Sequence, residues 1–382
     1  MTKKFLSLRY KNDGKSQVKL NYRQKQTVNK IKADLKNGIL KWEYNKCLCT
    51  IDNDLTLGLK DRRGLQYRTV ICKNCGLIRS NPRISSDSMD IFYDYYYRNL
   101  ITPKYKQDEK HLLANTFEQE AEKAKGVLKF IEDKTILKEA MVFDFGAGTG
   151  GMVEVFKNAG FETFGVDLNE NYLRFGLNRG LNLKKGSLDE LKNYSRKANL
   201  IIASHILEHL PNLDITIKGL WECLEDNSFL CVILPGLFKV QDIYGSLQPY
   251  FVIEHLYYFT LSTLKKVIMR NGFKFIAGNE DIIAVFQKSS KSYNINISKE
   301  YLDNILLYLR INDVPLPLNA NKTIKNKNKL KNKILISLIS FLYLTKLINI
   351  FAILRTLLGK KLKSQNLISK LSWILSRIIR FF

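Results

Sequence analysis

The chain has 382 residues, of which 45% are hydrophobic, and a formal net charge of +25. This composition supplies a real core and excludes a disordered protein, and the length allows one α/β domain with additions at either end. The charge is uneven, because Lys322–Phe382 contains fourteen Lys or Arg and no Asp or Glu. Met1–Lys41 has no apolar run, so we expect no cleavable signal peptide. Six cysteines suit a reducing, cytoplasmic interior.

Two cysteine pairs follow a basic N-terminal segment, residues 1–45, which the sequence does not assign. Cys47 and Cys49 are separated from Cys72 and Cys75 by twenty-two residues. Four thiolates at such spacing can close a tetrahedral zinc site, and a closed shell of ligands would make it structural. The alternative is two unligated pairs in a reduced fold.

A tyrosine-rich segment, Asp87–Asn99, comes next and is followed by helical spacing over Asp108–Glu139. Tyr93 and Tyr97 are candidates for contacting a substrate, because tyrosine rings stack on flat or apolar surfaces and their hydroxyls form hydrogen bonds. An aromatic packing stripe with a spacing of four residues explains the same pattern equally well.

A glycine turn follows the predicted strand Met141–Phe145, and a helix is expected from about Met152. Without Cβ atoms, Gly146, Gly148 and Gly150 allow a sharp turn and a close approach to a ligand. The helix N-terminus then directs free N–H groups at that ligand.

Two carboxylates indicate which kind of nucleotide or nucleoside the turn binds. Asp167 ends the next predicted strand, Phe161–Val166, where it can accept hydrogen bonds from both hydroxyls of a ribose. Gly151 also satisfies the dinucleotide fingerprint of dehydrogenases, but Asp144 would repel a pyrophosphate and suits a cation such as an ammonium group. The two acids favour a ligand with an ammonium at one end and a ribose at the other.

The segment D-F-G-A-G-T-G with Asp167 resembles the class I S-adenosylmethionine-dependent methyltransferases. The resemblance implies S-adenosylmethionine as the cofactor and an α/β fold with a doubly wound, mostly parallel, seven-stranded Rossmann-like sheet. Ser187 would then lie near the adenine, although it can equally be the N-cap of a helix. The expected cofactor-binding residues are Asp144, Gly146, Gly148, Gly150, Asp167, Ser187, Leu188 and Ser204.

Alternating apolar runs complete the predicted sheet domain. We expect strands near 181–183, 200–204 and 229–234, helices over 213–224 and 261–271, and a terminal antiparallel hairpin of 273–277 and 282–287.

A Glu-His pair in the loop after the fifth strand is the candidate for chemistry. Since the cofactor supplies the electrophile, the protein must place the acceptor and remove its proton. His255 is the expected base, and Glu254 could orient or charge it; a surface histidine beside a capping glutamate is the alternative. The "LEHL" stretch containing His209 matches the family and is expected to close the cofactor pocket.

The stretch E-H-L-Y-Y-F-T from Glu254 looks like methyltransferases that modify nucleotide-linked sugars or surface polysaccharides. In their C-methylating branch a matching Glu-His pair supplies the base, a role that would carry to Glu254 and His255. These relatives also carry an N-terminal zinc module and a tyrosine-rich lid. Their first cysteine pair is usually C-x-x-C, so the single residue between Cys47 and Cys49 departs from the pattern.

The chain therefore divides, by expectation, into a basic segment (1–45), a zinc-binding module with a lid (46–100), a methyltransferase domain (101–290), a linker region (291–333) and a basic amphipathic helical tail (334–382). The longest charge-free run of the tail, Ile334–Thr345, has twelve residues, too few to span a membrane. We expect it to lie on an anionic membrane surface, at the inner face; a dimerisation arm or helical cap is the alternative.

A second function class stays open: a zinc-containing nucleic-acid-binding protein or RNA methyltransferase. The near-neutral charge of Met141–Gln287 does not favour nucleic acid as a partner. A degenerate enzyme without turnover is a third possibility, indicated by Asn199, where relatives commonly have Asp.

Overall fold

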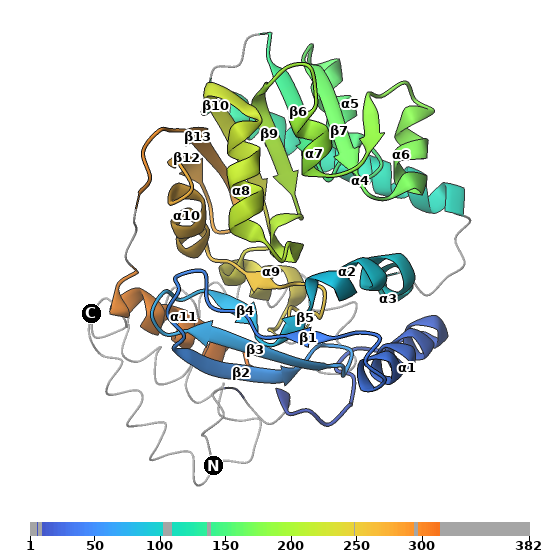
Figure 1. The fold of residues 1–382 in the computed structure, drawn as a ribbon, viewed down its shortest axis with the longest axis vertical. Helices are drawn as coiled ribbons and strands as arrows, with labels where there is room; N and C mark the ends of the chain where they lie inside the picture. Colours follow the sequence, from blue (N-terminus) through green and yellow to red (C-terminus); the bar gives the residue numbers. More distant parts are fainter. Residues whose placement is uncertain are drawn as a thin grey trace, which may run out of the picture. The chain divides into compact units, whose positions relative to one another are not determined.

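The computed structural model describes Leu6 and residues 10–101, 109–135, 139–247, 249–293 and 297–313 (Figure 1). All of these belong to the first of the two units into which the chain divides, Met1–Pro315. The expected tail, 334–382, and most of the linker region lie outside the described residues.

A seven-stranded sheet forms the centre of the predicted methyltransferase domain (Figure 1). Its strands lie in the order β12-β13-β10-β9-β6-β7-β8, and all are parallel except β13, which is antiparallel to both of its neighbours. This confirms the predicted mostly parallel α/β sheet and its terminal hairpin. The strands are β6 (Met141–Phe145), β7 (Glu162–Asp167), β8 (Leu183–Lys185), β9 (Ala198–Ser204), β10 (Leu224–Ile233), β12 (Phe273–Gly278) and β13 (Ile283–Lys288).

Helices cover both faces of this sheet, which explains why its strands read as continuous apolar runs. The helices α4 and α5 share one buried cluster with residues of β6, β9 and β10, whereas α8 and α10 contribute to the cluster on the opposite face. The helices are α4 (Glu109–Glu132), α5 (Gly151–Asn158), α6 (Glu170–Leu177), α7 (Leu188–Lys192), α8 (Leu213–Glu222) and α10 (Leu261–Met269).

The region that contains the four cysteines, residues 47–80, is called the cysteine region. It forms a separate antiparallel sheet of four strands in the order β11-β4-β3-β2. Three strands come from the N-terminal part of the chain, but β11 is contributed by the loop that contains the Glu-His pair. This loop therefore belongs structurally to the cysteine region as much as to the catalytic domain. The strands are β2 (Asp54–Lys60), β3 (Gln66–Cys72), β4 (Ile78–Ser80) and β11 (Tyr257–Tyr258).

The N-terminal segment that the sequence left unassigned contains a helix, α1 (Tyr22–Lys36), which begins with a capping box between Asn21 and Gln24. Gln24 also donates to the main-chain oxygen of Leu100 at 2.8 Å, tying α1 to the tyrosine-rich segment. That segment is helical throughout: α2 (Ser86–Phe92), a π-helical turn (Tyr93–Tyr97) and α3 (Arg98–Ile101).

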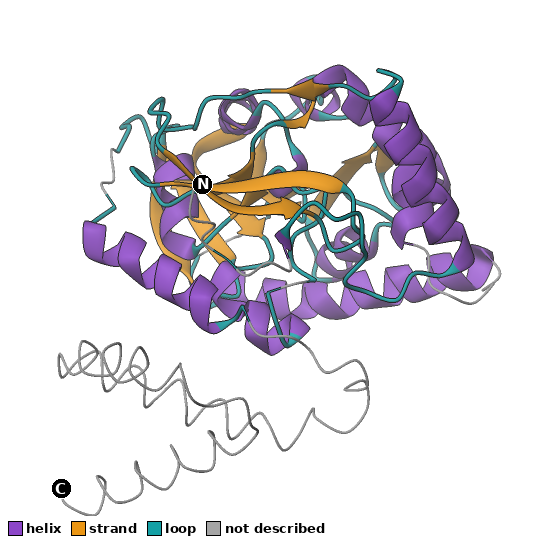
Figure 2. Cartoon of the chain, turned by 90° about the horizontal axis from the view of Figure 1, so that it is seen from below, coloured by secondary structure: helices purple, strands orange, loops and turns teal. Residues whose placement is uncertain are grey.

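The remaining elements are short strands and helices at the edges of these two sheets: β1 (Trp42–Glu43), which pairs with β5 (Arg83–Ile84), the 3₁₀ turns Leu207–His209 and Leu237–Lys239, α9 (Val240–Tyr244) and α11 (Lys299–Ile311). Viewed from below, the strands lie in the interior with helices around them (Figure 2). Across the described ranges, no helix combines the length and the apolar character needed to cross a membrane.

Candidate functional site

The glycine turn lies at the carboxyl end of β6 and has the backbone that only glycine adopts easily. Gly146, Gly148 and Gly150 have φ of +87°, +55° and +91°. The N–H groups of Gly146 and Ala147 both donate to the oxygen of Val166 at 2.9 Å, which joins the turn to the end of β7. The turn thus has the sharp, left-handed backbone that the sequence predicted for these glycines.

Glu120 of α4 is a residue of this turn that the sequence reasoning missed. Its Oε2 accepts from the Thr149 hydroxyl at 2.6 Å and from the Gly151 N–H at 3.2 Å. The carboxylate therefore binds at the N-terminus of α5, where the helix dipole favours a negative charge. No local spacing reveals this contact, because α4 and the turn are joined only by tertiary packing.

Asp167 lies at the end of β7 and is bound by the loops on either side of it. Its Oδ2 accepts from the Gly148 N–H at 2.9 Å, and its Oδ1 accepts from the Asn169 N–H at 2.7 Å. A carboxylate offers about four acceptor sites, so roughly two remain for the diol of a ribose. This geometry fits the role expected for Asp167.

Asp144 is 3% exposed, and its Oδ1 has no hydrogen-bond partner among the described residues. Burial, with repulsion from Glu120 and Asp167, raises the pKa of Asp144 well above its ordinary value. Such an unpartnered buried carboxyl group is stabilised by a cation. The three acids and the glycine turn therefore fit a nucleoside that carries a positive charge.

The other expected cofactor residues lie at the same edge of the sheet. Ser187 precedes α7, but its hydroxyl makes no capping bond, and Leu188 is partly buried against the core. Ser204 ends β9, and its hydroxyl accepts from Lys123 Nζ of α4 at 3.2 Å. The next residue, His205, has a φ of +56°, an uncommon backbone for a side chain other than glycine.

Glu254 does not bond its neighbour His255. Its Oε2 and Oε1 instead accept from Nη1 and Nη2 of Arg63 at 2.8 Å and 2.9 Å. Burial opposes ionisation, but the Arg63 guanidinium lowers the pKa of Glu254 to about 2. The carboxylate is therefore held by the cysteine region, an arrangement that the sequence analysis did not foresee.

Glu208 is the carboxylate that faces the histidines. It is 2% exposed, and neither of its oxygens has a hydrogen-bond partner among the described residues. Its Oε1 lies 3.3 Å from His205 Nδ1 and 3.9 Å from His209 Nε2, and the rings of His209 and His255 meet edge to face at 4.8 Å between centroids. Three of the four histidines of the chain thus gather around one buried carboxylate.

The histidine cluster contains an unpartnered ring nitrogen. Burial, with repulsion from His209, lowers the pKa of His255 to about 3, so the ring is neutral at pH 7. Its Nδ1 has no hydrogen-bond partner among the described residues, and at so low a pKa a proton taken up there needs the nearby Glu208 carboxylate to stabilise it. Glu208, His209 and His255 also offer ligand atoms that lie within 4.8 Å of one another, a set that could hold a cation.

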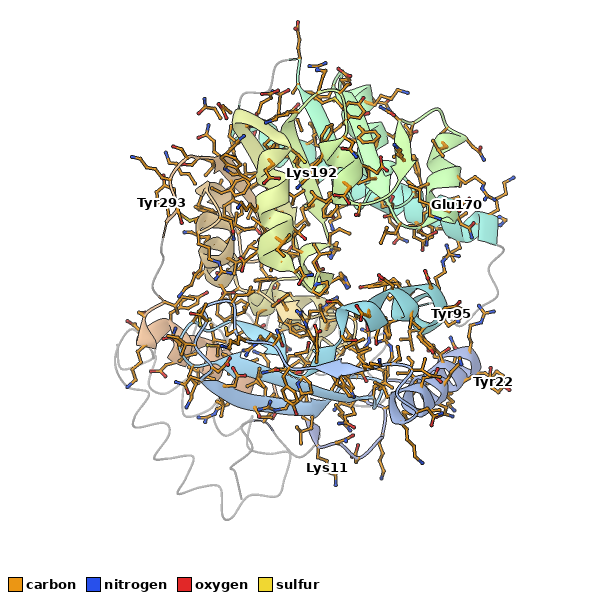
Figure 3. The ribbon with its side chains drawn as sticks, in the orientation of Figure 1. Lys11, Tyr22, Tyr95, Glu170, Lys192 and Tyr293 are labelled. Carbon is orange, nitrogen blue, oxygen red and sulfur yellow. The ribbon has the colours of Figure 1, made fainter. Side chains whose placement is uncertain are left out.

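The two candidate tyrosines face this cluster. The Tyr93 hydroxyl lies 2.8 Å from His209 Nδ1, and the Tyr97 ring packs against the rings of Tyr93 and His209 at 5.0 Å and 6.4 Å. Tyr95 of the same turn, labelled in Figure 3, is 67% exposed. The turn therefore presents two rings to the histidines, which a packing stripe alone does not require.

The four cysteines predicted as zinc ligands come together. Cys47 Sγ lies 3.4 Å from Cys75 Sγ, and Cys49 Sγ lies 3.6 Å from Cys72 Sγ; none is in a disulfide. Tetrahedral zinc with Zn–S bonds of 2.3 Å places sulfur atoms ~3.8 Å apart, so the donor set fits this metal. The short first pair does not prevent the cluster from forming.

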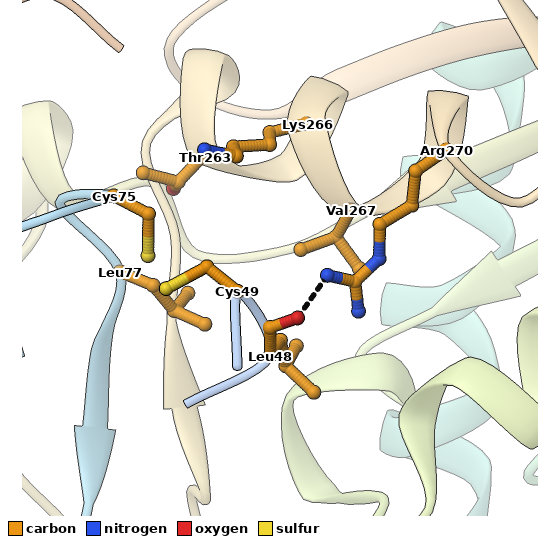
Figure 4. A pocket seen from close by; sticks show the side chains of 8 residues that line it. All are labelled: Leu48, Cys49, Cys75, Leu77, Thr263, Lys266, Val267 and Arg270. Carbon is orange, nitrogen blue, oxygen red and sulfur yellow. Dashed lines mark hydrogen bonds between the residues drawn. The ribbon is translucent and has the colours of Figure 1, made fainter. Parts of the chain in front are cut away.

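The cysteine loop also contacts the catalytic domain. Arg270 at the end of α10 donates to the main-chain oxygen of Leu48. Both residues line a small pocket, and Val267 of α10 lines it too (Figure 4). The cysteine cluster is thus fixed against the helix that follows the Glu-His loop.

Asn199 lies at the opposite edge of the sheet, where its Oδ1 accepts from the Met141 N–H at 2.9 Å. This contact supports the amino ends of β6 and β9. The departure at Asn199 therefore lies far along the strand from the glycine turn.

Comparison with known families finds a match in the central part of the chain. Residues 116–277 match a family model described as a methyltransferase domain. The chain therefore carries a methyltransferase domain, and the strand order and the glycine turn agree with the predicted class I, S-adenosylmethionine-dependent type. No curated protein matches the chain.

Solved structures similar to the chain include several such enzymes. One, an S-adenosylmethionine-dependent methyltransferase from Archaeoglobus fulgidus, is 21% identical, with 55% of this chain and 95% of that chain covered and a TM-score of 0.37. Another is DesVI from Streptomyces venezuelae, 14% identical, with 49% and 100% covered and a TM-score of 0.36. A methyltransferase from Thermotoga maritima, described as a possible histamine N-methyltransferase, is 15% identical, with 47% and 92% covered and a TM-score of 0.35.

Proposed function

We propose that this enzyme methylates a sugar, either in a nucleotide-linked form or as part of a cell-surface glycan. The observation that carries the proposal is the cluster of His255, His209, Tyr93 and Glu208 beside the glycine turn. Ile206 joins the two regions, because a Cβ built on Gly146 would lie only 2.2 Å from the Ile206 side chain. The cluster is therefore adjacent to the proposed cofactor site.

S-adenosylmethionine supplies, when bound, a methyl group on a positively charged sulfur. Asp167 would hold the ribose hydroxyls, and Asp144 favours the positive end of the molecule. Ser187, Leu188 and Ser204 line the same edge of the sheet and complete the proposed binding residues.

His255 is the proposed base. Its Nδ1 would take the proton that the acceptor hydroxyl or activated C–H loses on accepting the methyl group that S-adenosylmethionine would supply. Glu208 stabilises the positive charge that the histidines then carry. Glu254 does not act on the acceptor directly, because both oxygens of its carboxylate are bound to Arg63; its proposed role is to hold the loop that carries His255.

The aromatic side chains beside the histidine cluster support a sugar as the acceptor. Tyr93 and Tyr97 offer rings and hydroxyls that suit a neutral acceptor rich in hydroxyl groups.

Zinc is the proposed occupant of the four-cysteine cluster, where it would hold β2, β3 and β4 together rather than take part in the reaction. The segment from Ile334 is the proposed contact with anionic membrane at the inner face, a hypothesis that rests on its sequence alone. Flotation with anionic liposomes should be lost on deleting Ile334–Phe382, and unchanged flotation would refute the contact.

The function is tested by transfer of labelled methyl groups to a panel of nucleotide sugars, cell-envelope glycans and RNA. We expect label on a sugar with the native protein, and strongly reduced label with His255→Ala. Label on RNA would overturn the sugar assignment. Undiminished transfer by the variant would exclude His255 as the base.

A further inference from the structure

The turn between β2 and β3 contains a buried ionic cluster that reaches the Glu-His loop. Arg63 is 2% exposed, and its guanidinium makes two parallel bonds of 2.8 Å and 2.9 Å to Glu254. Asp61, which is fully buried, lies 3.5 Å from the same guanidinium and accepts from the Leu65 N–H at 2.9 Å. A side chain 191 positions away in the sequence thus holds the residue next to the proposed base.

The cysteine region also holds the main chain of this loop. The Tyr67 hydroxyl donates to the His255 oxygen, and the Ser80 N–H donates to the Leu256 oxygen at 3.0 Å. Together with Arg63, these contacts attach three consecutive loop residues to β3, β4 and the turn between β2 and β3.

The other side of the loop is bonded to the histidine cluster. The Glu254 main-chain oxygen lies 3.0 Å from His209 Nδ1, and the Leu256 N–H donates to the main-chain oxygen of Glu208 at 2.8 Å. Glu254 is thus bonded directly to His209 and is next to His255 in the chain.

We propose that Arg63 is a positioning residue of the active site: by clamping Glu254 it sets the relative placement of the His209 and His255 rings. The cysteine region then contributes a residue that positions the active-site histidines. Arginine suits this role because its planar fork fixes a carboxylate in two dimensions, which a lysine ammonium cannot do. A displacement of about 1 Å at a reacting group can cost about a hundredfold in rate.

Arg79 provides a matched control. It is a fully buried arginine of the same sheet, and it makes an equivalent pair of bonds, 2.8 Å and 2.9 Å, to Asp54. No contact is found between its side chain and Glu254 within the described part of the chain. Loss of the Arg79 side chain should release Asp54 while the bonds between Arg63 and Glu254 stay in place.

The test is histidine NMR on the full chain, labelled at the imidazole carbon, in which only four ring signals occur. We expect Arg63→Met to shift the His209 and His255 signals and to leave the His111 signal unchanged, with Arg63→Lys intermediate. Arg79→Met should leave all four in place. If Arg63→Met does not fold, Arg63→Lys and Glu254→Gln weaken the same clamp. Unchanged His209 and His255 signals in a folded Arg63 variant, or equal shifts in Arg79→Met, would overturn the proposal.

A kinetic readout rests on the proposed function and separates the two ideas. With a sugar acceptor, Arg63→Met should lower kcat about a hundredfold while the KM for S-adenosylmethionine stays within about twofold. A loss confined to KM would contradict the positioning role. The NMR result needs no acceptor, so failure to find a sugar substrate leaves that test of Arg63 intact.

Discussion

The glycine turn and the histidine cluster lie next to each other but are built in different ways. The turn comes from one β-α-β unit, with Asp144 and Asp167 separated by a single helix. The cluster combines the β2–β3 turn, the tyrosine-rich helix, the end of β9 and the loop that ends in β11. The cofactor region is therefore local in sequence, whereas the proposed proton acceptor depends on long-range packing.

The electrostatics of the two regions differ as well. Around the turn, burial raises the pKa values of Asp144, Glu120 and Asp167, and repulsion from neighbouring carboxylates adds to the rise at Asp144 and Glu120, so a bound cation would stabilise the ionised acids. Around His255, one carboxylate faces three imidazoles, so a proton can be accepted without a separate counter-ion. One region is suited to hold a positive ligand and the other to take up a proton.

The largest effect is expected at the turn. Gly146→Ala places a Cβ 2.2 Å from Ile206 and requires a left-handed backbone at φ +87°, so binding of S-adenosylmethionine should fall below detection. Gly160→Ala is the matched control, since Gly160 has φ +92° with nothing within 4 Å of the added atom. Titration calorimetry distinguishes them, and equal binding by both variants would contradict the role of the turn.

Loss of a zinc ligand should destabilise the cysteine region. Cys72→Ser should remove one zinc per chain and destabilise the cysteine region by about 4 kcal/mol or more, the scale of losing a structural metal. Metal analysis and thermal unfolding measure this. Retention of zinc by the variant, or an unchanged unfolding temperature, would exclude the four-cysteine site as a structural zinc centre.

Removal of the proposed base should affect catalysis alone. His255→Gln should lower kcat by about a thousandfold, within the range typical of a lost general base. The KM for S-adenosylmethionine should stay nearly constant, because the turn is untouched. A fall of less than tenfold, measured with the sugar acceptor, would remove His255 from this role.

The smallest effect concerns stability at low pH. The pKa of His255 is lowered to about 3 from 6.5, so below pH 6.5 the unfolded chain binds a proton that the folded chain does not. Stability is therefore lost as the pH falls from 6.5 towards 3, by about 1.4 kcal/mol per pH unit from this residue. Denaturant unfolding at pH 6 and pH 4 should show this extra loss in the native protein relative to His255→Gln; parallel curves would contradict it.

The sheet domain was predictable because its signals are local. Apolar runs, the glycine turn and Asp167 follow from neighbouring residues, and the predicted elements differ from the observed ones mostly at their ends. Glu120, Glu208 and Arg63 were not assigned roles, since each acts across a tertiary contact that no spacing encodes. The helix α1 was missed because its mean hydropathy is low and only four of its residues are buried.

We propose that Asp167 binds the cofactor whereas His255 acts only in proton transfer. Calorimetric titration of S-adenosylmethionine into Asp167→Ala and His255→Gln, side by side with the native protein, tests this proposal most directly. His255→Gln should bind as the native chain does, whereas Asp167→Ala should bind at least about tenfold more weakly, the loss expected when a half-buried carboxylate no longer accepts ligand hydroxyls. Equal binding by all three proteins, or equal loss in both variants, would contradict the account.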